Sequence, residues 1–167
     1  MKEINIRPVS SGDIEMICII AVNAWQSIHE GYRKYIGDDD LAGRLSRNWQ
    51  AEKARQVRDK AEKYPDTVLV SELNGKIVGF STFEMNKETG IGEICNNAVT
   101  PDCQGMGIGS AQHNEVLKIF QMHGMKYAIV LTGYEDEGHS KARASYEKVG
   151  FKKMRTSVTY SLILSSL

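Results

Sequence analysis

A loop with three glycines separated by single residues lies in the middle of the chain, Gln104-Gly105-Met106-Gly107-Ile108-Gly109. It follows a strand-like run that ends at Pro101 and precedes an amphipathic stretch. Glycines let a backbone turn tightly and approach a ligand without a Cβ clash. The first turn of a following helix adds unpaired N–H groups and a positive dipole end. The pattern predicts a site for phosphate oxygens, with a turn that only packs a helix on a sheet as the alternative.

Two better-known phosphate motifs fit this loop badly. A P-loop ends in Gly-Lys-Ser/Thr, whereas Gly109 is followed by Ser110 and Ala111. A dinucleotide-binding fingerprint follows the first strand of a parallel β-α-β unit, whereas these glycines follow a series of hairpins. A nucleotide- or NAD-binding module is therefore kept only as a further alternative.

The elements before the loop are predicted from apolar spacing. Ile4 and Ile6 alternate with polar residues as a strand, and helices are expected over about 10–27 and 38–63. The aromatic, glycine-containing stretch 29–37 between them is expected to be a loop. Asn74-Gly75, flanked by apolar runs, suits the tight turn of a hairpin, and Ile91–Val99 is the next strand.

The second half alternates helices with strands. A helix is expected over 107–123, a central strand over Tyr127–Leu131 and a helix over 140–149. Val158, Tyr160, Leu162 and Leu164 alternate as a final strand. The predicted fold is a single domain over residues 3–164, a mixed and mostly antiparallel α/β (α+β) sheet flanked by helices, in the order β-α-α-β-β-β-α-β-α-β.

Composition restricts the partners of this domain. The chain has 167 residues, with 21 Lys+Arg balanced by 21 Asp+Glu, so it lacks the basic excess that nucleic-acid binders usually carry. Its three cysteines show no metal-ligand spacing, and the N-terminal residues do not resemble a signal peptide. The longest apolar stretch, Ile14–Ala24, is too short to span a bilayer. We expect a cytoplasmic protein with no metal, nucleic-acid or membrane partner.

Two segments resemble the GNAT superfamily of N-acetyltransferases. The glycine loop matches its Q/R-x-x-G-x-G/A signature, and Ala98-Val99-Thr100-Pro101 is similar to the strand end that leads into it. Ala142 to Phe151 resembles the A-x-x-x-Y-E-K-x-G-F segment of the same superfamily. With the order of elements, the resemblance covers nearly the whole chain. It implies an acetyl-CoA-dependent acyltransferase, and homodimers are common among such proteins.

The resemblance also implies roles for particular residues. The main chain at Ala98 and Val99 would pair with the pantetheine arm, and the N–H groups of Gln104 to Gly109, with Ser110, would hold the pyrophosphate. Tyr146 stands where the family often has a tyrosine that protonates the departing thiolate. The remaining positions expected near the coenzyme are Ala142, Arg143 and His139, the last replacing a common asparagine.

Glu93 is the candidate general base, because an attacking amine must first lose a proton. Some family members place a catalytic glutamate at a matching position on this strand. Side chains alternate along a strand, so one face is expected to carry the odd-numbered residues Glu93, Cys95, Asn97 and Val99. The alternative is an exposed glutamate without a catalytic role.

The predicted function is direct transfer of an acetyl group from acetyl-CoA to a primary amine of a small molecule or peptide. The first alternative is a non-catalytic acyl-CoA-binding regulatory domain of the same fold. The wall of the site for the acceptor amine is expected near four aromatic residues of the first half: Trp25, His29, Tyr32 and Tyr35. These residue types do not identify the amine.

Overall fold

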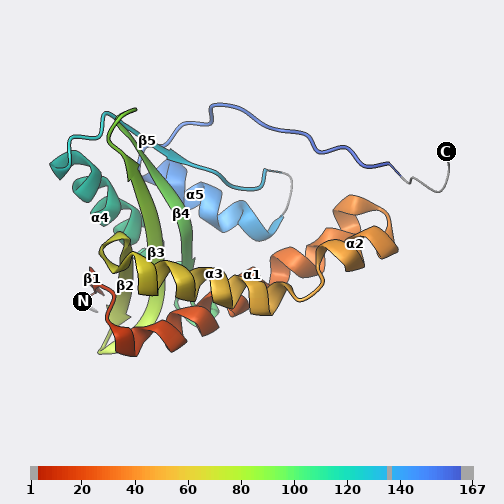
Figure 1. Cartoon of the computed structure of the whole chain (residues 1–167), viewed down its shortest axis with the longest axis horizontal. Coiled ribbons are helices and arrows are strands. Elements are labelled where there is room, and N and C mark those ends of the chain that lie inside the picture. The colour runs from red at the N-terminus through yellow and green to blue at the C-terminus, as the bar shows by residue number, and fades with distance from the viewer. Residues whose placement is uncertain (1–3, 135–136, 163–167) are drawn as a thin grey trace.

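The computed structural model describes residues 4–134 and 137–162. Its described residues form a five-stranded sheet in the order β1-β2-β3-β4-β5 (Figure 1). The strands are β1 Ile4–Pro8, β2 Val68–Leu73, β3 Lys76–Asn86, β4 Ile91–Val99 and β5 Tyr127–Val130. Neighbouring strands are antiparallel except β4 and β5, which are parallel. Asn74 and Gly75, both at positive φ, make the expected turn of the β2–β3 hairpin.

Helices cover both faces of this sheet. They are α1 Ile14–Ile36, α2 Asp39–Leu45, α3 Trp49–Lys63, α4 Ile108–Met122 and α5 Ser140–Lys148, with 3-10 turns at Ser11–Asp13, Pro65–Thr67, Pro101–Cys103 and Glu137–His139. On one face, Ile17 of α1 and Val57 of α3 pack with Phe80 of β3. On the other, Val116 and Phe120 of α4 pack with strand residues. The mixed, mostly antiparallel α/β architecture agrees with the prediction, and no described helix is long and apolar enough to cross a membrane.

The helices of the first half differ from the prediction in two places. The first helix does not end near Ser27 but continues through the expected loop to Ile36, because Ile28 is buried and packing sustains the helix. It ends where Gly37 takes a positive φ of 69°. The expected helix over 38–63 is split into α2 and α3, because Asn48 adopts a left-handed conformation at φ 58°.

The expected final strand is absent from the described residues. Residues 151–162 form no strand, and Val158, Tyr160 and Leu162 are exposed, while Leu164 lies outside the described residues. Alternation alone does not make a strand, because its backbone groups need a neighbour to pair with. In the described part of the chain this segment has no such neighbour.

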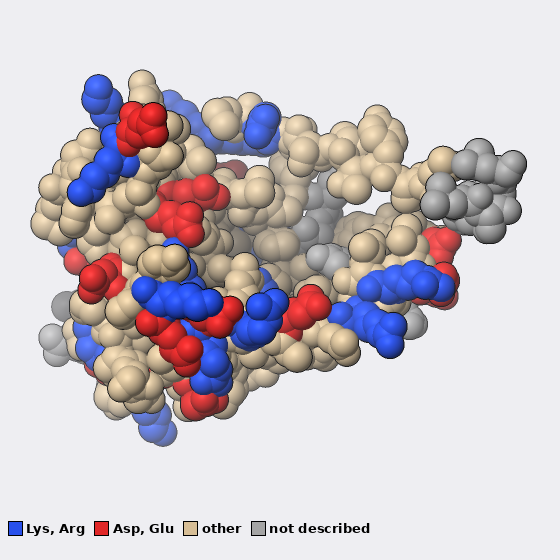
Figure 2. All heavy atoms as spheres, in the orientation of Figure 1, with Lys and Arg blue, Asp and Glu red and all other residues tan. Residues whose placement is uncertain are grey.

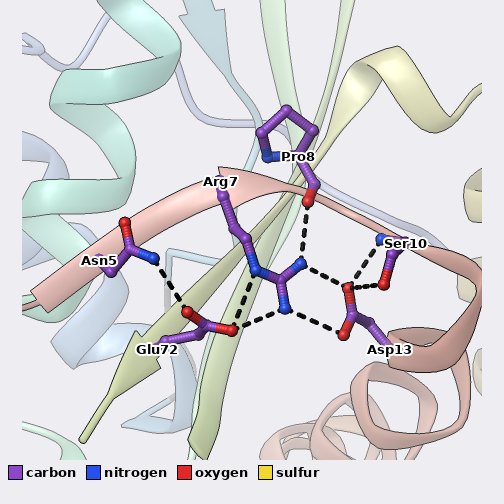
Figure 3. Close-up of polar contacts among 6 residues, drawn as sticks. All are labelled: Asn5, Arg7, Pro8, Ser10, Asp13 and Glu72. Atoms are coloured by element: carbon purple, nitrogen blue, oxygen red, sulfur yellow. Dashed lines mark hydrogen bonds and ion pairs between the residues drawn. The ribbon is translucent and has the colours of Figure 1, made fainter. Parts of the chain in front are cut away.

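Arg7 joins the first strand to its surroundings (Figure 3). Its Nη1 donates to Oδ2 of Asp13 at 2.6 Å, and its Nη2 donates to Oε1 of Glu72 at 2.6 Å. The guanidinium therefore holds the pKa of the Asp13 carboxyl well below its usual range and also lowers the pKa of Glu72. This network connects β1 to the start of α1 and to β2.

A Gly92→Ala substitution is expected to destabilise the protein by roughly 1–3 kcal/mol, because the interior is already filled. A Cβ at this position would lie 2.6 Å from atoms of the Phe120 ring, which is only 2% exposed and cannot move into solvent. Urea unfolding measures the loss. The matched control is Gly43→Ala in exposed α2, where a Cβ meets nothing within 4 Å and a small gain in stability is expected. Equal behaviour of the two variants would contradict the prediction.

Candidate active site

The glycine loop turns through left-handed backbone conformations that favour glycine. Gly105 has φ 81° and Gly107 has φ 83°, and Gly107 immediately precedes α4. Its carbonyl oxygen accepts the hydrogen bond of the Ala111 N–H at 3.0 Å, which begins the helix. Gly109 allows a close approach of α5, since a Cβ there would lie 3.1 Å from Oγ of Ser145. The N–H of Gln104 donates to the carbonyl oxygen of Pro101 at 3.2 Å, against the prediction that it is available to a ligand. The N–H groups of the later loop residues and of the first turn of α4 gather at one place.

Gln104 holds this loop between two elements. Its Nε2 donates to the carbonyl oxygen of Val99 at the end of β4, at 3.1 Å. Nζ of Lys141, in α5, donates to Oε1 of Gln104 at 2.8 Å. The side chain thus fixes the loop relative to both the sheet and α5.

A cavity opens where β4 and β5 separate. Their parallel pairing runs from Ile91 with Tyr127 to Ile94 with Val130, and no pair is formed beyond it between described residues. The cavity there has a volume of about 830 Å³ and reaches from α1 to the glycine loop and α5. Its charged lining side chains are all cationic among the residues that the structure describes: Lys34, Lys141 and Lys148. Outside the cavity, Figure 2 shows charges of both signs intermingled over the visible face.

A β-bulge in β4 overturns the expected common face of Glu93, Cys95, Asn97 and Val99. Ser81 pairs with Asn97 and Phe83 with Ile94, so the single residue Thr82 stands opposite two residues of β4. The N–H of Asn96, one of these two, donates to Oγ1 of Thr82 at 3.0 Å. One extra residue reverses the alternation of every side chain that follows it.

The bulge places the two ends of β4 in different environments. Glu93 pairs with Glu84, which accepts a hydrogen bond from Lys60 of α3, so Glu93 faces the helices α1 and α3. Asn97 instead contacts Tyr146 of α5 on the opposite face. Glu93 is not among the residues that line the cavity, whereas Cys95 and Asn97 are.

Tyr146 lies in the cavity wall with its ring buried. Its hydroxyl donates to Oδ1 of Asn97 at 2.6 Å, and its ring contacts the ring of His113, with centroids 4.7 Å apart. Burial raises the pKa of Tyr146 to about 12, while the hydrogen bond to Asn97 opposes that shift. The phenol therefore keeps its proton at neutral pH, and in this structure that proton is directed to Oδ1 of Asn97.

The structure brings most of the predicted residues to the cavity. Its lining includes Ala98, Val99, Gln104, Gly105, Gly107, Ile108, Gly109, Ser110, His139, Ala142 and Tyr146. Met106 and Arg143 are not among the lining residues. Nη1 of Arg143 donates to the carbonyl oxygen of Gly133 at 2.7 Å.

The aromatic residues expected in the acceptor wall separate into two groups. Trp25 and Tyr35 line the cavity, and Nζ of Lys53 lies 4.2 Å from the centroid of a Trp25 ring. His29 instead stacks on Trp49 at 4.1 Å between ring centroids. The side chain of Tyr32 lies outside what the structure describes.

Several residues that line the cavity were not predicted from the sequence. Asn97 was expected in the strand but not as the partner of Tyr146, because the bulge leaves no clear signal in the residue types. Lys141, Ser145 and Lys148 lie four and three residues apart in α5 and all reach the cavity. That helical spacing was a usable signal, since such residues share one face.

Residues 25–151 match the Acetyltransferase (GNAT) family. The chain is 26% identical over 141 residues to a mycothiol acetyltransferase of Streptomyces avermitilis, covering 84% of this chain and 41% of that protein. The chain thus spans about two fifths of the length of the mycothiol acetyltransferases that it matches.

Solved structures show the same fold. The PaiA N-acetyltransferase of Thermoplasma acidophilum, in complex with coenzyme A, matches with a TM-score of 0.70 and 19% identity over 93% of both chains. An aminoglycoside acetyltransferase from an uncultured soil metagenomic sample, in complex with sisomicin, matches with a TM-score of 0.61 and 16% identity over 96% of both chains.

Proposed function

Because the chain belongs to the GNAT acetyltransferase family, we propose that it transfers the acetyl group of acetyl-CoA to a primary amine of a small molecule or peptide. The observation that carries the proposal is a continuous cavity that connects the glycine loop to Tyr146 between the separated ends of β4 and β5. A donor bound there would have its phosphates at the loop and its thioester beside the phenol.

The residues at the donor end fit acetyl-CoA. Free N–H groups of the loop, including that of Met106, and of the first turn of α4 would hold the pyrophosphate, with the lysines of α5 nearby. The pantetheine would run along the end of β4. The carbonyl oxygen of Val99 accepts from Nε2 of Gln104 and has a second lone pair for a pantetheine amide, whereas that of Ala98 lies beside Gly79 of β3 and accepts from Gln112.

The proposed reaction uses groups on both faces of β4. The amine enters from the side of α1 and α3 and passes its proton to Glu93 through water. Its nitrogen attacks the thioester carbonyl, the C–N bond forms, and the C–S bond breaks while the second proton lost by the nitrogen passes to solvent. Tyr146 then gives its proton to the departing thiolate, and the proton held by Glu93 returns to Tyr146 through solvent. The products are the acetamide and free coenzyme A.

Glu93→Gln is expected to lower kcat/KM for the amine by roughly 10²-fold at pH 7, because the amide cannot accept a proton. The loss should shrink as the pH rises, since a larger fraction of the amine is then already neutral. Thiol release measured against pH checks both statements. Glu84→Gln is the matched control, because Glu84 pairs with Glu93 across the ladder on the same face. Equal rates in the wild type and in both variants would remove Glu93 from the mechanism.

The acceptor class is supported by the relatives only at the level of small amines. One matched protein is named for mycothiol and another is bound to an aminoglycoside. A panel of amines screened with acetyl-CoA by thiol release tests the proposal directly. Thiol release that depends on one of these amines supports an enzyme.

The second candidate is a regulatory domain that binds acyl-CoA without turnover, since the glycine loop serves binding equally well. Thermal shifts with acetyl-CoA and with NAD, compared with turnover, distinguish the enzyme, the regulatory domain and an NAD-binding module. Stabilisation by acetyl-CoA without turnover on any amine would favour the regulatory domain. Stabilisation by NAD alone would overturn both.

A further inference from the structure

Lys53 of α3 is a half-buried cation beside the wall of the cavity. Its Nζ lies 4.2 Å from the centroid of a Trp25 ring, and Trp25 is a lining residue. The same Nζ donates to Oδ1 of Asn96 at 3.2 Å. The two neighbours of Asn96 in β4, Cys95 and Asn97, also line the cavity. Lys53 therefore borders the part of the wall that α1 and β4 share, on the side from which the amine is proposed to enter.

The charge of Lys53 is not balanced by a carboxylate. Its other hydrogen bond is to Oε1 of Gln56 at 2.8 Å, so both of its acceptors among the described residues are neutral amide oxygens. In the same helix Lys60 is matched by Glu84 at 2.9 Å. A cation that is partly removed from water without an opposite charge is unfavourable, and burial accordingly lowers the pKa of Lys53. An anion bound beside Lys53 would remove this penalty.

The other charges around the cavity have the same sign. The charged side chains among its described lining residues are Lys34 of α1 and Lys141 and Lys148 of α5. Burial, together with the positive charge of Lys53, lowers the pKa of His29 in α1. A wall of this composition repels an acceptor with several ammonium groups and attracts one that carries a negative group.

Asn96 supplies a second donor at the same place. Its main-chain N–H is held by Oγ1 of Thr82 in the bulge, and its Oδ1 accepts from Lys53. Its Nδ2 group makes no hydrogen bond with a described residue, so it remains a donor for a ligand. Nζ of Lys53 and Nδ2 of Asn96 suit the two oxygens of a carboxylate, because a charge-assisted hydrogen bond can form to each.

We propose that the acceptor is an amine that also carries a carboxylate, and that this carboxylate binds Lys53 and Asn96 beside Trp25. The inference rests on the proposed acetyl transfer and narrows its acceptor. The amine of such a molecule is turned toward Glu93 and its carboxylate toward Lys53, so the two ends are recognised by opposite charges. A polyamine has no group for Lys53 and leaves its charge unbalanced.

Thiol release from acetyl-CoA tests the charge of the acceptor with matched amines. Each α-amino acid and each ω-amino acid in a series of chain lengths is compared with its own carboxamide and with the diamine of the same length. The best acid is expected to exceed its carboxamide in kcat/KM by roughly 10- to 100-fold, the usual effect of a hydrogen bond to a charged group. The diamine is expected to be the poorest of the three.

Substitution of Lys53 tests the residue itself. Lys53→Gln is expected to lower kcat/KM for the acid by roughly 10- to 100-fold through KM, and to leave kcat and the rate with the carboxamide nearly unchanged. Lys53→Arg should keep the preference for the acid, and Lys53→Glu should transfer it to the diamine. The matched control is Lys63→Gln at an exposed position of the same helix, which should behave as the wild type. Thermal unfolding verifies that each variant is folded.

Two results would count against different parts of the proposal. Carboxamides or diamines that react as fast as the acids, or a preference for the acid that survives Lys53→Gln, would overturn the inference and leave acetyl transfer intact. Absence of thiol release with every amine of the panel would instead overturn the acetyl transfer on which the inference rests.

Discussion

Tyr146→Phe is expected to lower kcat for acetyl transfer by roughly 10²-fold, which is the usual lower range for the loss of a general acid. The KM for acetyl-CoA should change only a few-fold, because the ring and its contacts with His113 and Phe151 are retained. Since the pKa of Tyr146 is about 12, the phenol stays protonated through the neutral range. The wild-type kcat should therefore not fall through ionisation of Tyr146 below about pH 11. Steady-state rates of thiol release against pH measure both properties.

Asn97→Ala tests whether Asn97 acts through the Tyr146 hydroxyl. Without Asn97 the hydroxyl loses its 2.6 Å partner, and the hydrogen bond no longer opposes the upward shift of the Tyr146 pKa. We expect an intermediate loss of kcat, and we expect no further loss when Asn97→Ala is added to Tyr146→Phe. Additive losses in the double variant would show that the two residues act independently.

Acid is expected to destabilise the protein through His113, beginning at a pH above the range in which carboxylates titrate. The side chain of His113 is fully buried, neither ring nitrogen has a partner among the described residues, and burial lowers its pKa from 6.5 to about 4. Between these values the unfolded chain binds a proton that the folded chain does not. Stability is therefore lost as the pH falls from 6.5 to 4, by about 3 kcal/mol in total, and this group contributes no further loss at lower pH.

His113→Leu separates this contribution from that of other groups. The variant should lose about 3 kcal/mol less than the wild type between pH 7 and pH 4, and it should be at least as stable at pH 7, because no buried ring nitrogen is left unpaired. Urea unfolding at a series of pH values measures the difference. Asp13, whose pKa is lowered by Arg7, adds an acid-dependent loss that both proteins share. Parallel stability curves for the two proteins would contradict the role of His113.

The glycine-loop and α5 residues that line the cavity could be predicted because their signals are local. The positive-φ glycines at 105 and 107 carry the loop, and the spacing from Ala142 to Tyr146 fixes one face of α5. Apart from the split of 38–63 into α2 and α3, the order of strands and helices up to α5 could also be predicted, since apolar periodicity and the turn at Asn74-Gly75 are properties of short segments.

The features that were predicted wrongly depend on contacts between residues far apart in the sequence. Residues 29–36 have the composition of a loop, yet burial of Ile28 and neighbouring contacts continue α1 to Ile36. The alternation after Ile94 was predicted on the wrong face, because a bulge is set by pairing with β3 rather than by the residues of β4. The pattern at Val158, Tyr160 and Leu162 predicted a strand, but a strand forms only where a neighbour is present.

The bulge in β4 also bears on how such a domain can change over evolutionary time. It lets one strand serve two surfaces, with Asn97 turned toward α5 and Asn96 held by Lys53 of α3. Substitutions in α1 and α3 can then reshape the surface on the side of Asn96 without disturbing the residues beside the glycine loop. A lineage that keeps this extra residue can vary the side of α1 and α3 while the residues beside the glycine loop stay unchanged.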